Sequence, residues 1–264
     1  MTEPDRGGLC MAVARDGDAV VRLSGVLCAD TSESVRARLI GLLHDADCVV
    51  VDLDGVEIAH PAVLGVLASA LHDAGGWPVA KLAVLASRPE VRRALAEAEV
   101  DRFVVIIPAT DDAREACDRR PPEVRATWTL PAVDTSPGQA RWLLGDRLRL
   151  WGCRAGFVAD AVQLVNELVT NAVEHAGTEA RVAVHLEDGV LVCSVRDHSA
   201  VPPVPRRPGE GRGGFGLLLV DAIAQGWGWI PHPDGKTVWA VTGPPDEPPG
   251  PEPRAPVPPL PWVP

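Results

Sequence analysis

Glu167 and Asn171 stand four residues apart in the stretch NELVTNAVEHA, residues 166–176. The apolar residues of this stretch recur at helical spacing, so it is predicted to be a helix with one face on a core. At a spacing of four, the carboxylate and the amide lie on the same face of the helix, close to its apolar stripe. Burying such groups unpaired costs roughly 1–3 kcal/mol each. The pair is therefore expected to bind a ligand, or else to bond to each other at a helix boundary.

Two further elements follow along the chain. Asp197 ends a predicted strand in SVRDHSAVPP, and the glycine cluster GRGGFG, residues 211–216, opens an apolar helix before a strand containing GKTVWA. Taken singly, the aspartate could cap a turn and the glycines could form a hairpin. Together and in this order, the elements of residues 125–242 resemble the GHKL ATP-binding fold shared by histidine kinases and gyrase. The short loops are most similar to those of the anti-sigma-factor serine kinases.

The resemblance implies a site for ATP and Mg²⁺. Glu167 is expected to accept or orient the proton of an attacking hydroxyl, and Asn171 to bind Mg²⁺. Asp197 is expected to accept a hydrogen bond from the exocyclic amine of adenine, with Thr237 as a second contact near the base. Residues 209–216 are expected to cover the phosphates, which backbone N–H groups and the following helix N-terminus attract. The residues of this lid that are implied to contact the nucleotide are Gly211, Arg212, Gly213, Gly214 and Gly216.

One position departs from the pattern of the resembled family. Where that family usually has Asp-x-Gly, this chain has Asp197-His198-Ser199. Ser199 is small enough to let a nucleotide approach, and its hydroxyl can bond to the loop backbone. We therefore expect Ser199 to belong to the nucleotide site.

The N-terminal part of the chain must hold a separate set of elements. Residues 9–119 alternate between strand-like and helix-like segments, which predicts a mixed sheet with helices packed on it. The first strands are expected to form a hairpin at residues 16–18, and Thr31 or Ser32 to cap the helix that follows. The segments VVRLSGVL, CVVVDLDGV and GVEIAHPAVLGVL resemble STAS domains, the fold of anti-sigma-factor antagonists. A generic α/β domain is the alternative.

The resembled antagonists carry Asp-Ser-Ser-Gly at a turn between a strand and a helix, and their second serine accepts phosphate. The corresponding residues here are His60, Pro61, Ala62 and Val63. Ala62 stands at the acceptor position and has no hydroxyl, so this turn is predicted not to be phosphorylated. Ser69 lies roughly 10 Å farther along the predicted helix and is a poor substitute.

These elements predict a two-domain chain of α/β and α+β class. We expect a STAS-like mixed sheet at residues 1–120, followed by a GHKL (Bergerat) α/β sandwich at 121–243. Residues 244–264 are rich in proline, which predicts an extended tail without helix or sheet.

Composition limits the partners. The net charge is -11 and no run is rich in lysine or arginine, which argues against a nucleic-acid partner. No apolar run approaches the ~20 residues that a membrane span needs. The six cysteines are scattered and are expected to be small core thiols in a reducing compartment, so a cytoplasmic location is predicted.

The leading interpretation is a regulator of sigma-factor partner switching. Its ATPase-like domain would be a serine/threonine protein kinase that acts on a separate STAS-type antagonist and uses ATP and Mg²⁺. Its own STAS domain would escape phosphorylation. The alternative is a catalytically silent switch, in which the nucleotide only controls binding of a sigma factor or antagonist. A homodimer, and a contact between the chain's own two domains, are further expectations.

Overall fold

The computed structural model describes residues 8–16, 18–109, 113–203 and 216–243. They form two compact units. The first consists mainly of residues 1–127 and the second mainly of residues 128–264. The proline-rich tail lies outside the described residues.

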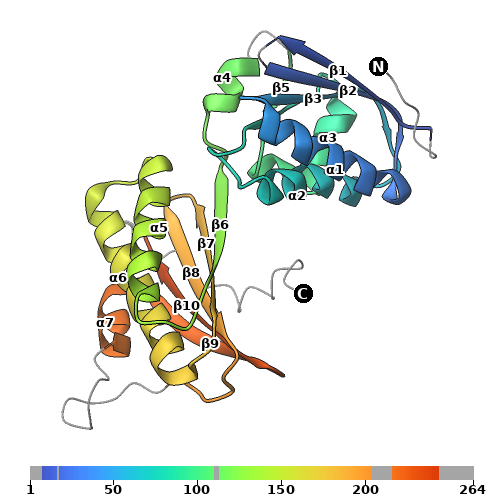
Figure 1. The fold of residues 1–264 in the computed structure, drawn as a ribbon. Helices are drawn as coiled ribbons and strands as arrows, with labels where there is room; N and C mark the ends of the chain where they lie inside the picture. The colour runs from blue at the N-terminus through green and yellow to red at the C-terminus, as the bar shows by residue number, and fades with distance from the viewer. Residues whose placement is uncertain (1–7, 17, 110–112, 204–215, 244–264) are drawn as a thin grey trace, which may run out of the picture. The chain divides into compact units, whose positions relative to one another are not determined.

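The first unit contains a five-stranded mixed sheet in the order β1-β2-β3-β4-β5 (Figure 1). Strands β1 and β2 form the predicted antiparallel hairpin, and the later strands run parallel to β2. The strands are β1 (Cys10–Asp16), β2 (Asp18–Leu27), β3 (Val49–Ile58), β4 (Leu82–Leu85) and β5 (Val105–Ile107). The helices are α1 (Ala29–Asp45), η1 (Pro61–Leu64), α2 (Gly65–Asp73), α3 (Pro89–Glu97), η2 (Val100–Arg102) and α4 (Ala113–Asp118). The prediction of a mixed sheet with helices packed on it is confirmed.

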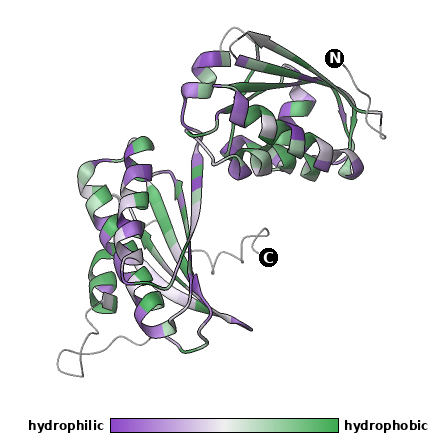
Figure 2. Cartoon of the chain, viewed as in Figure 1, coloured by the Kyte–Doolittle hydropathy of each residue, from purple (hydrophilic) through white to green (hydrophobic). Residues whose placement is uncertain are grey.

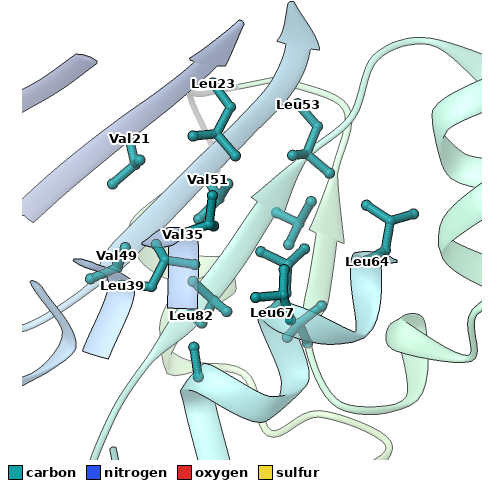
Figure 3. Close-up of a cluster of buried hydrophobic side chains, with 14 of the residues drawn as sticks. Val21, Leu23, Val35, Leu39, Val49, Val51, Leu53, Leu64, Leu67 and Leu82 are labelled. Atoms are coloured by element: carbon teal, nitrogen blue, oxygen red, sulfur yellow. The ribbon is translucent and has the colours of Figure 1, made fainter. Parts of the chain in front are cut away.

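The core of this unit lies on both faces of the sheet, because successive strand residues point in opposite directions. On β3, Val49, Val51 and Leu53 pack with residues of α1 and α2 (Figure 3). Cys48 and Val50 instead join a smaller cluster with residues of α4. Helices α1 and α6 show both purple and green segments in Figure 2, as expected for helices with one face on a core.

The start of α1 differs from the prediction. The helix begins at Ala29 with Cys28 as its N-cap, so neither Thr31 nor Ser32 caps it. Thr31 instead sits in the first turn, where its hydroxyl accepts a hydrogen bond of 3.0 Å from the backbone N–H of Cys28. The threonine satisfies the backbone of the cap from inside the helix, which spacing alone did not distinguish from capping.

The prediction that all six cysteines are free thiols was wrong for two of them. Cys48 and Cys117 form a disulfide, with 6.0 Å between their Cα atoms. They lie 69 residues apart in the sequence, but the fold brings both into the smaller core cluster beside α4. Cys193 fits the prediction, since burial raises the pKa of its thiol to about 12.

The second unit is built around a sheet in the order β6-β7-β8-β10-β9, with helices α5, α6 and α7 on one face (Figure 1). The strands are β6 (Glu123–Leu130), β7 (Ala180–Glu187), β8 (Val190–Asp197), β9 (Gly226–His232) and β10 (Gly235–Thr242). The helices are α5 (Ser136–Leu150), α6 (Ala155–Asn171), the π-helical turn η4 (Ala172–Ala176) and α7 (Gly216–Ile223). Strand β10 pairs antiparallel with both β8 and β9, and the predicted α+β architecture is confirmed. In the described part of the chain, no helix combines the length and apolar character needed to cross a membrane.

Candidate functional site

Helix α6 carries Glu167 beside its buried face. Its buried residues, among them Leu164 and Leu168, hold the helix on the core of the second unit. Glu167 Oε1 accepts hydrogen bonds from Gln163 Nε2 and Asn166 Nδ2, both at 2.9 Å. These two neutral donors fix the orientation of the carboxylate and leave Oε2 for another partner.

Asn171 is the last residue of α6, and the turn η4 follows it. Its Nδ2 is buried and has no hydrogen-bond partner among the described residues. A buried amide without a partner is uncommon, because it loses its hydrogen bonds to water and gains none. Rotation of the amide brings its oxygen to the same place, so the group suits a polar ligand or a hydrated cation. Among the described residues, Glu167 bonds to Gln163 and Asn166 and not to Asn171.

Helix α7 begins directly against Glu167. A Cβ atom built on Gly216 would lie 2.6 Å from Glu167 Oε2, so a larger residue at 216 would require the carboxylate to shift. α6 and α7 lie side by side in Figure 1. The first turn of α7 therefore lies beside Glu167, and the N-terminus of a helix is a favourable place for an anion. Gly211, Arg212, Gly213 and Gly214 lie outside the described residues.

Asp197 ends β8 beside the segment that follows η4. The next residue, His198, donates its backbone N–H to Thr178 Oγ1 at 3.1 Å, and β8 packs against both α6 and η4. Asp197 is 2% exposed. The fold thus brings the end of β8 to the same part of the unit as the end of α6.

The partner of Asp197 is a residue that the sequence analysis did not select. Lys236 Nζ lies 3.0 Å from Asp197 Oδ1 and 2.9 Å from Oδ2, and Lys236 is 5% exposed. Lys236 also donates to the backbone oxygen of Ser199 at 3.2 Å. The backbone N–H of Ser199 in turn donates to Asp197 Oδ1 at 2.8 Å. A buried ion pair therefore occupies the position where the sequence analysis expected only the hydrogen-bond acceptor Asp197.

The register between β8 and β10 places these two charges together. Lys236 is directly opposite Asp197 in the antiparallel ladder. The preceding residue, Gly235, has a φ of 153°, and a Cβ atom there would lie 2.0 Å from the backbone oxygen of Asp197. Only glycine lets β10 start this close to the end of β8.

Gly235→Ala is expected to destabilise the second unit by about 2–4 kcal/mol, because the added methyl group must move the backbone that aligns the ion pair. Urea denaturation of the full chain measures the loss. Gly226→Ala is the control, since no atom lies within 4 Å of the Cβ built there. Equal stabilities for the two variants would contradict the close approach at Gly235.

The structure does not bring Thr237 into this site. Its hydroxyl lies 2.9 Å from His232 Nε2, a residue of the neighbouring strand β9. Because side chains alternate along a strand, Thr237 points to the face opposite Lys236. Lys236, rather than Thr237, is therefore the β10 residue beside Asp197. The sequence contains a signal for this, since Lys236 shares the inward parity of Val238 and Ala240.

The hydroxyl of Ser199 bonds to the loop backbone, as the sequence analysis expected. Its hydroxyl accepts a hydrogen bond of 3.3 Å from the backbone N–H of Val201. Together with the bond from its N–H to Asp197, this contact orders the start of the loop after β8. The backbone of Ser199 thus contacts Asp197 directly, while its side chain holds the loop that follows.

In the first unit, Ala62 is exposed in the turn after β3. His60 is the N-cap of η1, and its Nδ1 accepts a hydrogen bond of 3.2 Å from the backbone N–H of Ala62. The turn therefore has the strand-to-helix position of an acceptor site, but the exposed side chain is a methyl group.

Each of the two units matches a known protein family. Residues 10–108 match the family described as "Mlab, STAS domain", and residues 130–242 match the family described as "Histidine kinase-like ATPase domain". The chain is a fusion of a STAS domain and a histidine kinase-like ATPase domain. This pair of domain types is that of the partner-switching regulators, and the ATPase domain implies nucleotide binding. No curated protein matches the chain.

Several solved structures are similar to parts of the fusion. An anti-sigma factor antagonist from Mycobacterium paratuberculosis is 24% identical, with a TM-score of 0.38, over 44% of this chain and 100% of that one. The RsbU and RsbW domains of a Mycobacterium tuberculosis protein are 26% identical, with a TM-score of 0.38, over 47% of this chain and 34% of that one. The unphosphorylated anti-sigma factor antagonist SpoIIAA is 14% identical, with a TM-score of 0.33, over 40% of this chain and 93% of that one.

Proposed function

We propose that the ATPase domain binds ATP with Mg²⁺ and transfers the γ-phosphoryl group to a serine of a separate STAS-type antagonist. The observation that carries this proposal is the meeting of Glu167 with the start of α7, one helical turn before the unpartnered amide of Asn171. An acid and the start of a helix thus lie side by side, one helical turn before an asparagine with a buried, unpartnered Nδ2. Phosphoryl transfer needs such positioning and charge stabilisation more than covalent chemistry.

Each residue has a separate task in this proposal. Glu167, oriented by Gln163 and Asn166, takes or directs the proton of the attacking serine hydroxyl. Asn171 holds Mg²⁺, which when bound neutralises charge on the phosphates. The backbone N–H groups at the start of α7 bind phosphate oxygen.

The STAS domain has a complementary role in this proposal. With a methyl group at Ala62, it cannot be switched off by phosphorylation at that turn. It would therefore act as a constitutive antagonist that binds an ATPase domain of the anti-sigma-factor type. Attachment to its own kinase domain gives it an effective concentration in roughly the millimolar range, so weak contacts suffice.

The test is phosphoryl transfer from γ-labelled ATP to serine-bearing STAS-type antagonists, with and without Mg²⁺. Labelled serine that depends on both Mg²⁺ and Glu167 is the expected result. Both functions need Asn171 and α7 to bind the nucleotide, but only the kinase transfers phosphate. Nucleotide binding without transfer to any antagonist would therefore favour the switch that only binds. Failure to bind any nucleotide would reject both functions.

Ala62→Ser is expected to convert the STAS domain from a non-substrate into a substrate. The turn is exposed, and serine adds the missing hydroxyl with little change in volume. Incubation of the variant with ATP, Mg²⁺ and wild-type chain, followed by mass spectrometry, locates the phosphate. Ser69→Ala in the Ala62→Ser background should leave the labelling unchanged. Phosphate on Ser69 of the wild type would contradict the account of Ala62.

A further inference from the structure

The sheet of the second unit has one face that the described helices of this unit do not cover. Helices α5, α6 and α7 lie on the other face, toward which the buried residues of β8 and β10 point (Figure 1). The alternate residues of these two strands point away from the helices and are only half-buried. Together with one residue of β9 they form an apolar, partly exposed group, here called the open-face patch, which consists of Val192, Ile230, Trp239 and Val241.

The register of the strands lays the indole ring of Trp239 flat on the sheet. Val241 lies directly opposite Val192 on β8, and Trp239 lies directly opposite Gly228 on β9. A Cβ atom built on Gly228 would lie 2.8 Å from Cζ2 of Trp239, so the ring occupies the space that a side chain at 228 would fill. Within the part of the chain that the structure describes, the indole N–H has no hydrogen-bond acceptor. Trp239 therefore offers both an apolar ring and a donor on this face.

The C-terminal segment of the chain begins beside the open-face patch. Strand β10 ends at Thr242, and Trp239 stands three residues earlier, about 10 Å back along the strand. Residues 244–264 lie outside the described residues, and more than half of them are proline. In a polyproline II conformation these residues would span about 65 Å. The segment is therefore long enough to turn back after Gly243 and cross the whole patch.

The composition of this segment matches what Trp239 offers. A polyproline II helix has no internal hydrogen bonds, so its carbonyl groups are available to a donor such as an indole N–H. Proline-rich segments bind to grooves lined by aromatic side chains, because little conformational entropy is lost when they dock. Val257, Leu260 and Trp262 add apolar side chains among the last prolines. Attachment to the same chain raises the effective concentration of the segment, so weak contacts suffice.

We propose that residues 251–264 dock as a polyproline II helix on the open-face patch of their own chain. A proline ring packs on the indole of Trp239, and a backbone carbonyl of the segment accepts its N–H. The apolar side chains near the C-terminus contact Val192 and Val241. This contact does not depend on nucleotide binding, because the patch lies on the face of the sheet opposite Glu167 and Asn171.

The experiment is NMR spectroscopy of the full chain labelled with ¹³C and ¹⁵N, in which each tryptophan gives one indole N–H signal. Trp239→Phe and Trp262→Phe assign the signals of these two residues and keep an aromatic ring at each position. In the wild type we expect nuclear Overhauser effects between the indole N–H of Trp239 and proline ring protons. Leu260→Asp should abolish these effects and shift the Trp239 signal, because it brings a charge onto an apolar surface.

A matched control and a dilution series complete the test. Val201→Asp adds the same charge at a residue that is 66% exposed outside the patch, so the Trp239 signal should keep its wild-type position and its contacts with proline. The wild-type spectrum should also be the same over a tenfold dilution, because the contact is made within one chain.

Each result supports or overturns the docking of this segment. Contacts between Trp239 and proline that are lost in Leu260→Asp alone, at every protein concentration, support it. A Trp239 signal that is the same in Leu260→Asp and in the wild type overturns it, whether the patch is bare or covered by another part of the chain. A signal that changes on dilution also overturns it, since the patch is then an interface between two copies.

Discussion

Replacing Glu167 with glutamine is expected to lower phosphoryl transfer about 100- to 10,000-fold while nucleotide affinity stays within a few-fold of the wild type. The amide oxygen of glutamine can still accept from Gln163 and Asn166, so the local packing of α6 is retained. What is lost is the group that takes the proton of the serine hydroxyl. Single-turnover transfer to an antagonist, together with nucleotide titration of the same sample, separates the two effects.

Glu174→Gln is the control for this experiment. Glu174 is an exposed acid on the turn after α6, so its neutralisation changes the net charge equally without touching the start of α7. Its transfer rate should equal that of the wild type. Full transfer by Glu167→Gln would reject the role of Glu167 as base and leave the carboxylate a structural contact of Gly216.

Asp197→Asn is expected to destabilise the ATPase domain by about 3–5 kcal/mol, because it leaves the ammonium of Lys236 buried without its counter-charge. Lys236→Met should cost a similar amount, since it strands the carboxylate instead. The double variant should recover most of the loss, because neither charge remains to be solvated. Urea denaturation of the four proteins gives the coupling energy of the pair.

The exposed pair of Arg196 and Asp234 provides the comparison within the same domain. Asp234→Asn should cost less than about 1 kcal/mol, because water and salt already screen that contact. Additive losses for Asp197→Asn and Lys236→Met would contradict the buried ion pair.

This prediction changes how nucleotide binding by Asp197→Asn must be interpreted. Loss of binding in that single variant would follow from loss of folding as readily as from a missing contact with the base. The double variant Asp197→Asn with Lys236→Met removes this ambiguity, because it is expected to fold. Binding by the double variant, compared with the wild type, isolates the contribution of the pair to base recognition.

The sequence predicted the elements better than the contacts between them. Hydrophobic periodicity located α6 and its polar face, and the glycine cluster predicted where α7 begins. Alternation along β10 would have placed Lys236 inward, but the resemblance drew attention to Thr237, one residue farther along. Because side chains alternate along a strand, the burial pattern of β10 shows that Lys236 and not Thr237 points inward, a choice that the motif alone does not make. The inward orientation of Lys236 was thus predictable from its local pattern, whereas its pairing with Asp197 was not.

Contacts that depend on the three-dimensional path of the chain could not be predicted in this way. Cys48 and Cys117 stand in segments with no common motif, and only the stacking of α4 on the sheet brings them together. The engagement of Asp197 depends on the register of β8 and β10, which are not consecutive strands because α7 and β9 lie between them in the sequence. Such pairings are set by packing over the whole domain, for which one sequence offers no direct measure.

The contact between Gly216 and Glu167 also bears on how such chains can diverge. A glycine at the start of a helix can be explained by a bound ligand, but here the carboxylate of Glu167 also crowds the position, because a Cβ atom on Gly216 would lie 2.6 Å from its Oε2. The restriction would persist in a descendant that had lost its nucleotide, for as long as the acid on α6 remained. A larger residue at position 216 should therefore be accommodated most easily once Glu167 has shifted or has been replaced, whereas Glu167 can change while Gly216 stays.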